Sequence, residues 1–238
     1  MRLPLLAAAL VLVSPLALHA DTVFATGFES PTYSPGALAG QVPYFQVDGT
    51  SGTVQSAIVR NGTQAVEFDA STDTAGQSVV RMDPHFTATP TDQTVDLQIA
   101  ALFTSTNAGT SYDILSVFSS AAFLDQLIYL DGVVSFGGNA AVAANVWNVY
   151  DLHIDYTTDL ITAYINGTMI GSEGFSSSAS DLRAVDIGIN SGPGNDAAYF
   201  DDFSVTNPVP EPSSLALLGT GALALVGAAR RRFLARQA

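Results

Sequence analysis

Two carboxylates that alternate on one predicted strand are the first candidates for chemistry. Glu67 and Asp69 stand two residues apart in the run Glu67-Phe68-Asp69-Ala70-Ser71, and residues two apart in a strand share a face. A retaining glycoside hydrolase uses two carboxyl groups about 5–5.5 Å apart. The alternative, which we adopt, is a pair of solvent-facing carboxylates on a half-buried strand. We therefore assign no catalytic residue and expect that the protein is not an enzyme.

A second group of carboxylates predicts a structural calcium site. Glu29 lies near the first strand, and Asp201 and Asp202 lie near the last one. If those strands are neighbours, the side chains converge, and Ca²⁺ binds six to eight oxygens of this kind. Asp196, in a glycine-rich loop, is a further oxygen donor. The alternative is that Asp201 and Asp202 cap or break the last strand through local hydrogen bonds. No cofactor is required.

Other metal or covalent chemistry has few residues available. The chain contains no cysteine and all its basic residues are arginines, which excludes thiolate ligands and Schiff bases. His85 and His153 do not form a pair with zinc-ligand spacing. His153 alternates with Asp151 and Asp155, which we interpret as a solvated polar face of a strand.

Aromatic side chains offer a possible platform for sugar rings. Tyr33, Tyr44 and Phe45 fall in a Pro/Gly-rich region before the first clear strand, where we expect exposure. Most other aromatics are expected to pack in the core or on sheet faces. Trp147 in particular is expected to anchor the core.

Alternation of apolar and polar residues predicts an all-β body without a sustained helical period. The dipeptides Asn61-Gly62, Asp131-Gly132 and Asn166-Gly167 are typical of type I′ hairpin turns. Ten strands in one unit favour two antiparallel sheets packed face to face. The predicted strands are 54–60, 64–70, 77–82, 94–103, 111–118, 126–130, 146–156, 160–166, 183–190 and 198–206.

The central and closing segments resemble concanavalin A-like or laminin-G-like jelly rolls. A tryptophan opens the run from Trp147 to Tyr156, and the next run ends in Tyr164-Ile165-Asn166-Gly167. The segments Gly27-Phe28-Glu29 and Ala198 to Val205 resemble the paired first and last strands of such sandwiches. The resemblance implies a jelly-roll sandwich that hosts lectins, carbohydrate-binding modules, glycosidases and adhesion domains. In the similar laminarinase-like enzymes a Glu-x-Asp-x-Glu strand is catalytic, whereas this chain has Ser71 at the third position.

The carboxyl-terminal thirty residues combine a motif, an apolar run and a basic cluster. Pro210, Glu211 and Pro212 precede an apolar run from Leu215 to Ala229, and the basic tail Arg230, Arg231 and Arg232 follows. As a helix the run would extend about 22 Å, against a hydrocarbon core of about 30 Å, so it can span with local thinning. The arginines favour the cytoplasmic side. A plain tail anchor or a buried core helix is the alternative.

This order of parts resembles the PEP-CTERM sorting signal. The resemblance implies that a membrane-embedded exosortase recognises Pro210-Glu211-Pro212 and processes the protein after export. The amino terminus agrees, because Met1-Arg2 and an apolar run from Leu3 to Leu18 form a secretory signal peptide for the secretion translocon. We therefore predict a signal helix (1–20), a β-sandwich domain (21–208) and a sorting signal with one transmembrane helix (209–238). The protein would be anchored transiently in the inner membrane.

The body is strongly acidic once both ends are set aside. Residues 21–208 contain three arginines and 21 acidic residues, a formal net charge of −18. Such a field repels nucleic acid, which excludes DNA and RNA as partners. The sequence thus predicts an envelope, surface or extracellular-matrix protein whose jelly roll associates with carbohydrate or exopolysaccharide. An extracellular glycoside hydrolase and a purely structural biofilm protein are the alternatives.

Overall fold

The computed structural model describes residues 21–41, 45–48, 52–72, 77–84, 86–88, 93–175, 179–191 and 194–207, with only the backbone described for 45–48. These residues belong to one compact unit that runs from Ala20 to Pro208. The predicted signal helix, transmembrane helix, sorting motif and basic tail lie outside the described residues. The described chain consists of strands, turns and loops, with no helix.

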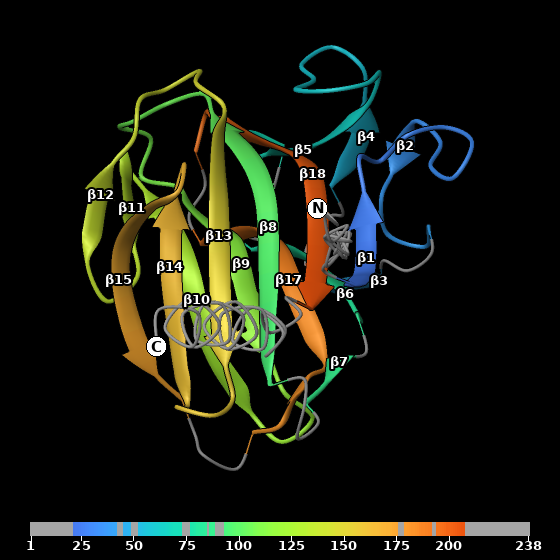
Figure 1. Cartoon of the computed structure of the whole chain (residues 1–238). Coiled ribbons are helices and arrows are strands. Elements are labelled where there is room, and N and C mark those ends of the chain that lie inside the picture. The colour runs from blue at the N-terminus through green and yellow to red at the C-terminus, as the bar shows by residue number, and fades with distance from the viewer. Residues whose placement is uncertain are drawn as a thin grey trace, which may run out of the picture. The chain divides into compact units, whose positions relative to one another are not determined.

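Most strands belong to two antiparallel sheets, one in front of the other in Figure 1. Sheet A has nine strands in the order β15-β14-β13-β8-β18-β5-β4-β2, with β1 also paired to β18. Its strands are β1 (Asp21–Thr26), β2 (Gly36–Ala37), β4 (Thr53–Gln55), β5 (Ala65–Asp69), β8 (Thr94–Phe103), β13 (Asn148–Asp155), β14 (Leu160–Ile165), β15 (Thr168–Gly174) and β18 (Ala197–Asn207).

Sheet B has seven strands in the order β12-β11-β10-β9-β17-β6-β3. They are β3 (Phe45–Asp48), β6 (Ser78–Met82), β9 (Ser111–Phe118), β10 (Phe123–Leu130), β11 (Val133–Ser135), β12 (Asn139–Ala141) and β17 (Ala184–Ser191). A small third sheet pairs β7 (Phe86–Thr87) with β16 (Asp181–Leu182). The prediction of an all-β body built from two antiparallel sheets is confirmed.

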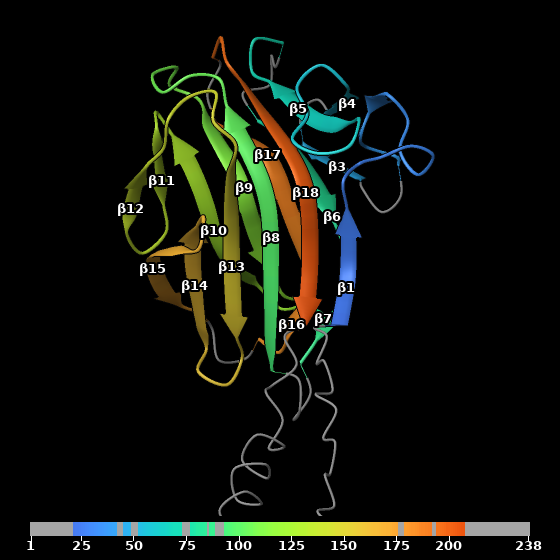
Figure 2. The ribbon, with the colours of Figure 1, turned by 45° about the horizontal axis from the view of Figure 1, so that its top comes forward.

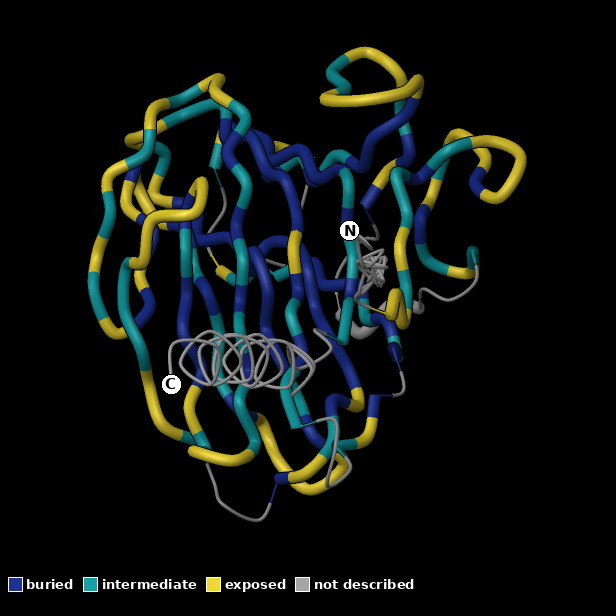
Figure 3. Tube along the Cα trace, in the orientation of Figure 1, coloured by how far each residue is buried: buried dark blue, intermediate teal, exposed yellow. Residues whose placement is uncertain are grey.

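The core lies between sheets A and B. Along β13 every second residue is buried, an alternation that Figure 3 shows as dark blue and teal segments. Phe103 of sheet A stacks on Tyr129 of sheet B, with ring centroids 3.7 Å apart, and Tyr112 lies 5.5 Å from Phe103. Burying a side chain of this size stabilises a fold by about 1.5–3 kcal/mol. The period-two pattern therefore decides which face of each strand points inward.

The long strand β18 has different neighbours along its two halves. Its first residues pair with β5, and its last residues pair with β1. Figure 2 shows β5 and β1 beside the two ends of β18. The register on the β8 side shifts between Asp201 and Ser204, and Asp202 has a φ of 51°. This bulge lies where β18 changes partners.

Glycines let sheet B approach sheet A at the β15 edge. A Cβ atom on Gly138 would lie 2.1 Å from the carbonyl oxygen of Ile170, and one on Gly171 would lie 2.0 Å from the carbonyl oxygen of Phe136. Real contacts are never this short, so a side chain at either position would displace the backbone. The turn between β11 and β12 therefore lies against β15 and covers an edge that would otherwise be open to other chains.

Most predicted strands are present, with two corrections. Residues 94–103 and 111–118 form strands with the predicted bounds, and both Asp131-Gly132 and Asn166-Gly167 have positive φ angles in turns between paired strands. The prediction of a strand over 54–60 with a hairpin turn at Asn61-Gly62 is wrong. Instead β4 ends at Gln55 and a loop follows, because carboxylates elsewhere in the fold hold its backbone, as described below. Strand β15, which contains glycine and alternates little, is not among the predicted strands, and neither are the short strands β2, β3, β7, β11, β12 and β16. The first strand, β1, ends at Thr26, so the segment Gly27-Phe28-Glu29 follows it rather than forming part of it.

Candidate functional site

A shallow hollow lies on the outer face of sheet A, the face turned away from sheet B. It has a volume of about 430 Å³, and we call its lining the polar face. Strands β8, β13, β14 and β18 contribute to it because residues two apart on each strand point outward together. The polar face consists of Asp96, Gln98, Asp151, His153, Tyr164, Ser204 and Thr206.

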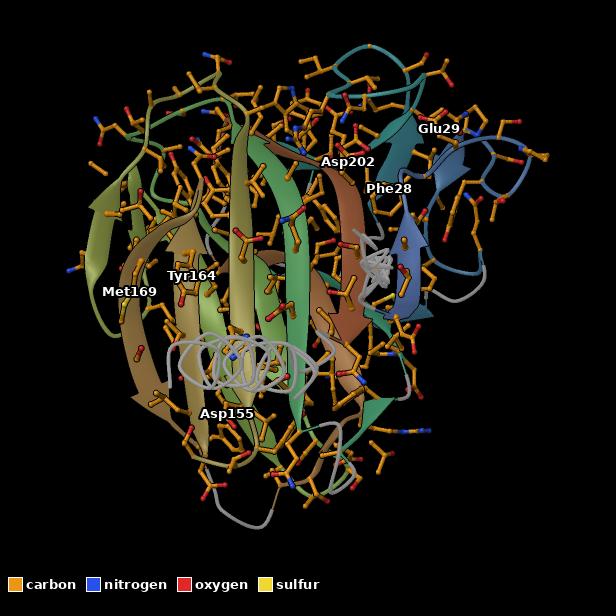
Figure 4. All side chains as sticks on the ribbon, viewed as in Figure 1. Phe28, Glu29, Asp155, Tyr164, Met169 and Asp202 are labelled. Atoms are coloured by element: carbon orange, nitrogen blue, oxygen red, sulfur yellow. The ribbon has the colours of Figure 1, made fainter. Side chains whose placement is uncertain are left out.

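Cross-strand pairs position the polar face. His153 lies opposite Asp96 and Asp151 lies opposite Gln98 in the register of β13 with β8. The Nδ1 atom of His153 is 2.5 Å from Oδ1 of Asp96, and the Gln98 amide donates to Oδ1 of Asp151 at 2.5 Å. Tyr164 of β14 pairs with Asp151 and shares this side of sheet A in Figure 4. These contacts hold carboxylate, amide and imidazole groups on one surface.

Two groups of the polar face have perturbed protonation. The hydrogen bond to the Asp96 carboxylate raises the pKa of His153 above its ordinary value. Partial burial raises the pKa of Asp151, although the hydrogen bond from Gln98 opposes this effect. The face therefore presents hydrogen-bond acceptors, an amide donor and an imidazole that is protonated more readily than a free histidine.

An apolar cluster lies on the same side of sheet A, further along β8, β13 and β18. Trp147 and Ile58 pack against Leu102, Ala197 and Tyr199 in a cluster separate from the main core. The prediction that Trp147 anchors the core between the sheets is therefore wrong, since its partners lie on the outer face. Along β13, six residues separate Trp147 from His153, or about 20 Å at 3.3 Å per residue. One side of sheet A thus carries an aromatic end and a hydrogen-bonding end.

Both carboxylates of the predicted pair, Glu67 and Asp69, accept hydrogen bonds from other residues of the domain. Tyr199 donates its hydroxyl proton to Oε1 of Glu67 at 2.6 Å. Oδ1 of Asp69 accepts from the backbone N–H of Ser71 at 2.9 Å and from its hydroxyl at 2.6 Å. Glu67 therefore positions Tyr199 and Asp69 stabilises a turn, consistent with the structural interpretation of these residues.

Asp201 is a fully buried carboxylate at the bulge of β18. Its Oδ2 accepts from the backbone N–H groups of Arg60 and Asn61 at 3.0 and 3.1 Å, and its Oδ1 accepts from the N–H of Asp202 at 2.8 Å. Burial nevertheless raises its pKa to about 6. Asp201 therefore joins the loop between β4 and β5 to β18, which explains why Asn61-Gly62 does not form a hairpin turn.

The two other predicted calcium ligands hold the same loop, beside Asp201. Asp202 pairs with the Arg60 guanidinium at 2.9 Å, and Glu29 accepts from the N–H of Thr63 at 2.8 Å and from that of Gln64 at 3.1 Å. The hydrogen bond from the Thr63 hydroxyl lowers the pKa of Glu29. Figure 4 shows Glu29 and Asp202 near the top of β1.

The predicted calcium site is not preformed. The three carboxylates do converge, since a Cβ atom on Gly27 would lie 3.6 Å from Cγ of Glu29 and 3.8 Å from one oxygen each of Asp201 and Asp202. Within the described ranges, however, no group of three His, Asp or Glu side chains could hold a metal ion. The oxygens are instead bonded to loop donors. Asp196 is bonded to the Thr110 hydroxyl at 2.7 Å, five strand residues or about 16 Å from Asp201.

The predicted sugar-stacking aromatics are placed differently from expectation. Tyr33 is only 2% exposed and packs edge-on against Phe28, with centroids 5.7 Å apart, so the expectation that it is exposed is wrong. The reason is that the Pro/Gly-rich region folds back onto the core. Tyr44 lies outside the described residues, and only the backbone of Phe45 is described, paired with Arg81 in sheet B.

Sequence reasoning missed most of the polar face. It identified Asp151 and His153 as an alternating polar strand face, which the structure confirms. It did not single out Asp96, Gln98 or Tyr164. The alternation of polar residues at Asp96 and Gln98 within a predicted strand was a usable signal, whereas the pairing of β8 with β13 was not visible.

Comparison with known families identifies the carboxyl-terminal signal. Residues 208–232 match the PEP-CTERM protein-sorting motif. The motif indicates an exported protein that an exosortase processes at the membrane, as the sequence predicted. No curated protein matches the chain. Within the described residues, no helix has the length and apolar character needed to cross a membrane.

Comparison with solved structures shows β-sandwich domains of similar fold. A structure described as a sialidase matches with a TM-score of 0.54 and 10% identity, over 79% of this chain and 19% of that chain. The binding domain of Paraclostridial Mosquitocidal Protein 1 matches with a TM-score of 0.51 and 14% identity, over 83% and 51%. The binding domain of botulinum neurotoxin DC, in complex with rat synaptotagmin II, matches with a TM-score of 0.53 and 11% identity, over 84% and 52%. The chain spans about half or less of these structures, and identities this low show the fold alone.

Proposed function

We propose that this is a surface or extracellular-matrix protein whose jelly-roll domain binds polysaccharide through the outer face of sheet A. The observation that carries the proposal is the hollow of about 430 Å³ lined by hydrogen-bonding side chains, with the partly buried Trp147 further along the same face of sheet A. Sugar recognition needs polar groups that fix orientation and apolar rings that cover the ring faces. The structures of similar fold include binding domains and a sialidase, so other proteins use this fold for binding.

The sorting motif supports the location in which such a ligand would be met. A signal peptide directs the chain to the secretion translocon, and an exosortase processes the motif after export. The body then stays in the cell envelope, on the surface or in the matrix, where it would meet exopolysaccharide. Binding rather than cleavage is proposed, since Glu67 and Asp69 take part in structural hydrogen bonds.

The Tyr164→Ala variant tests the proposal. Tyr164 lines the hollow, and removing an aromatic contact at a binding surface weakens affinity by about tenfold or more. Retardation of the purified protein in gels that contain neutral polysaccharides should therefore be lost in the variant. Phe123→Ala is the matched control, because Phe123 is a 49% exposed aromatic on sheet B. Release of new reducing ends would identify an enzyme instead, and no retardation by any polymer would favour a purely structural protein.

A further inference from the structure

The cations of the β-sandwich domain are all used within the fold. Residues 21–208 contain three arginines and no lysine. Each forms an ion pair: Arg60 with Asp202 at 2.9 Å, Arg81 with Asp186 at 2.6 Å and Arg183 with Asp83 at 2.9 Å. The remaining charge of the domain is therefore negative, apart from protonated histidine.

The polar face also carries more acidic than basic side chains. Asp151 takes its hydrogen bond from the neutral amide of Gln98, and none of the arginines in the described part of the chain pairs with it. Asp96 is paired with His153, which neutralises it only when the imidazole is protonated. Asp155 continues the outward side of β13 but is bonded to Thr157 and Thr158 in the following turn. The hollow thus offers the Asp151 carboxylate without a cationic partner among the described side chains, beside the Asp96–His153 pair.

We propose, on the basis of the polysaccharide binding proposed above, that the polar face selects amino-sugar polymers with free ammonium groups and rejects uronic-acid and sulfated polymers. A protonated amine bound beside Asp151 would form the cationic partner that the fold itself does not supply. Ser204 and Thr206 on β18 then face the neutral hydroxyl groups of the adjoining sugars. A carboxylate or sulfate in the same place would be desolvated against Asp96 and Asp151.

The contribution of charge to the binding affinity is modest because the polar face is open to solvent. Exposed ion pairs are weak and salt screens them. Selectivity therefore comes from several amines along one chain, together with repulsion of anionic polymers by the field of the whole domain. Neutral polymers still bind through hydrogen bonds and aromatic contacts, although less tightly.

Calorimetric titration of the purified protein with three soluble oligomers tests the inference at mildly acidic pH. The probes are a glucosamine oligomer, its fully N-acetylated and therefore neutral form, and an oligogalacturonate. We expect the glucosamine oligomer to bind most tightly and oligogalacturonate not to bind. Asp151→Asn, which keeps the oxygen that Gln98 contacts, should weaken glucosamine binding about fivefold, equivalent to about 1 kcal/mol. It should weaken binding of the neutral oligomer less than binding of the glucosamine oligomer, because only the glucosamine oligomer presents an ammonium group to Asp151.

Asp159→Asn is the matched control, because it removes one charge from the turn between β13 and β14, outside the hollow. It should change glucosamine binding less than Asp151→Asn does. Equal affinity for all three oligomers, or equal effects of the two variants, would overturn the charge selection while leaving polysaccharide binding intact. Absence of binding to every oligomer, at low and high salt alike, would overturn both proposals.

Discussion

Replacing Asp113 by asparagine is expected to stabilise the domain at pH 8. Asp113 lies on β9 between the core residues Tyr112 and Ile114, and only 5% of it is exposed. Burial raises its pKa from 3.8 to about 7, an effect that the Ser116 hydroxyl only partly offsets and that the nearby Asp186 carboxylate increases. A shift of this size corresponds to about 4 kcal/mol as an upper limit. We expect a gain on the order of 3 kcal/mol in the free energy of unfolding at pH 8.

The pH dependence follows from the direction of this shift. Because folding raises the pKa of Asp113, the native state binds a proton that the unfolded chain releases. The protonated carboxyl therefore contributes stability below the unfolded pKa of 3.8, and this contribution is lost as the pH rises through about 7. Burial also raises the pKa of Asp186 and Asp196, so these two carboxyl groups likewise lower the stability of the domain as the pH rises.

Urea denaturation at pH 5 and pH 8 measures this effect. The native protein should be more stable at pH 5, and Asp113→Asn should reduce the difference between the two pH values. Asp159→Asn, in an exposed turn, is the control for the loss of one negative charge. A variant that is destabilised equally at both pH values would show that the carboxylate of Asp113 forms stabilising contacts in its ionised form.

Replacing Asp201 by alanine is expected to destabilise the domain strongly. The variant leaves three backbone N–H donors, those of Arg60, Asn61 and Asp202, without the carboxylate that accepts from them. Leaving buried donors unsatisfied costs about 1–3 kcal/mol per group, although water can reach part of this loop. We expect a loss of about 3 kcal/mol, or a fall of roughly 6–12 °C in Tm.

Asp202→Ala is the comparison for this prediction. Its carboxylate is partly exposed, and its ion pair with Arg60 contributes about 1 kcal/mol or less. Recording the same melting curves with millimolar calcium and with chelator addresses the role of these carboxylates. The geometry predicts overlapping curves, because the oxygens are bonded to protein donors. A clear calcium-dependent rise in Tm that Asp201→Ala abolishes would contradict this interpretation.

The sequence predicts those strands of the sandwich in which most residues are buried, because these strands contain a clear run of apolar side chains. β8 and β9 follow their predicted bounds because most of their residues are buried, so apolar and β-branched side chains fill them. The strand β15 escapes prediction because it lies at an edge, where Gly171 serves a close backbone approach rather than alternation. The loop after β4 also escapes, because Glu29 and Asp201, distant in sequence, hold its shape.

The candidate site shows the same limit. Alternation places Asp151 and His153 on one face, which the sequence predicts. Their partners come from β8, some fifty residues away, and only the pairing of β13 with β8 brings Asp96 and Gln98 opposite them. Likewise the exposure of Tyr33 was predicted from local composition, but a long-range contact with the core buries it. The local alternation of residues thus predicts which side chains share one face of a strand. The order of the strands in the sheet decides which of these side chains become neighbours.

Polysaccharide titration of the purified protein, followed through the imidazole NMR signals of His153, tests whether the outer face of sheet A binds the polymer. His153 lines the hollow on sheet A. If this face is the binding surface, the His153 signals shift in proportion to bound polymer. Saturating binding that leaves the His153 signals unchanged would show that the polymer binds elsewhere.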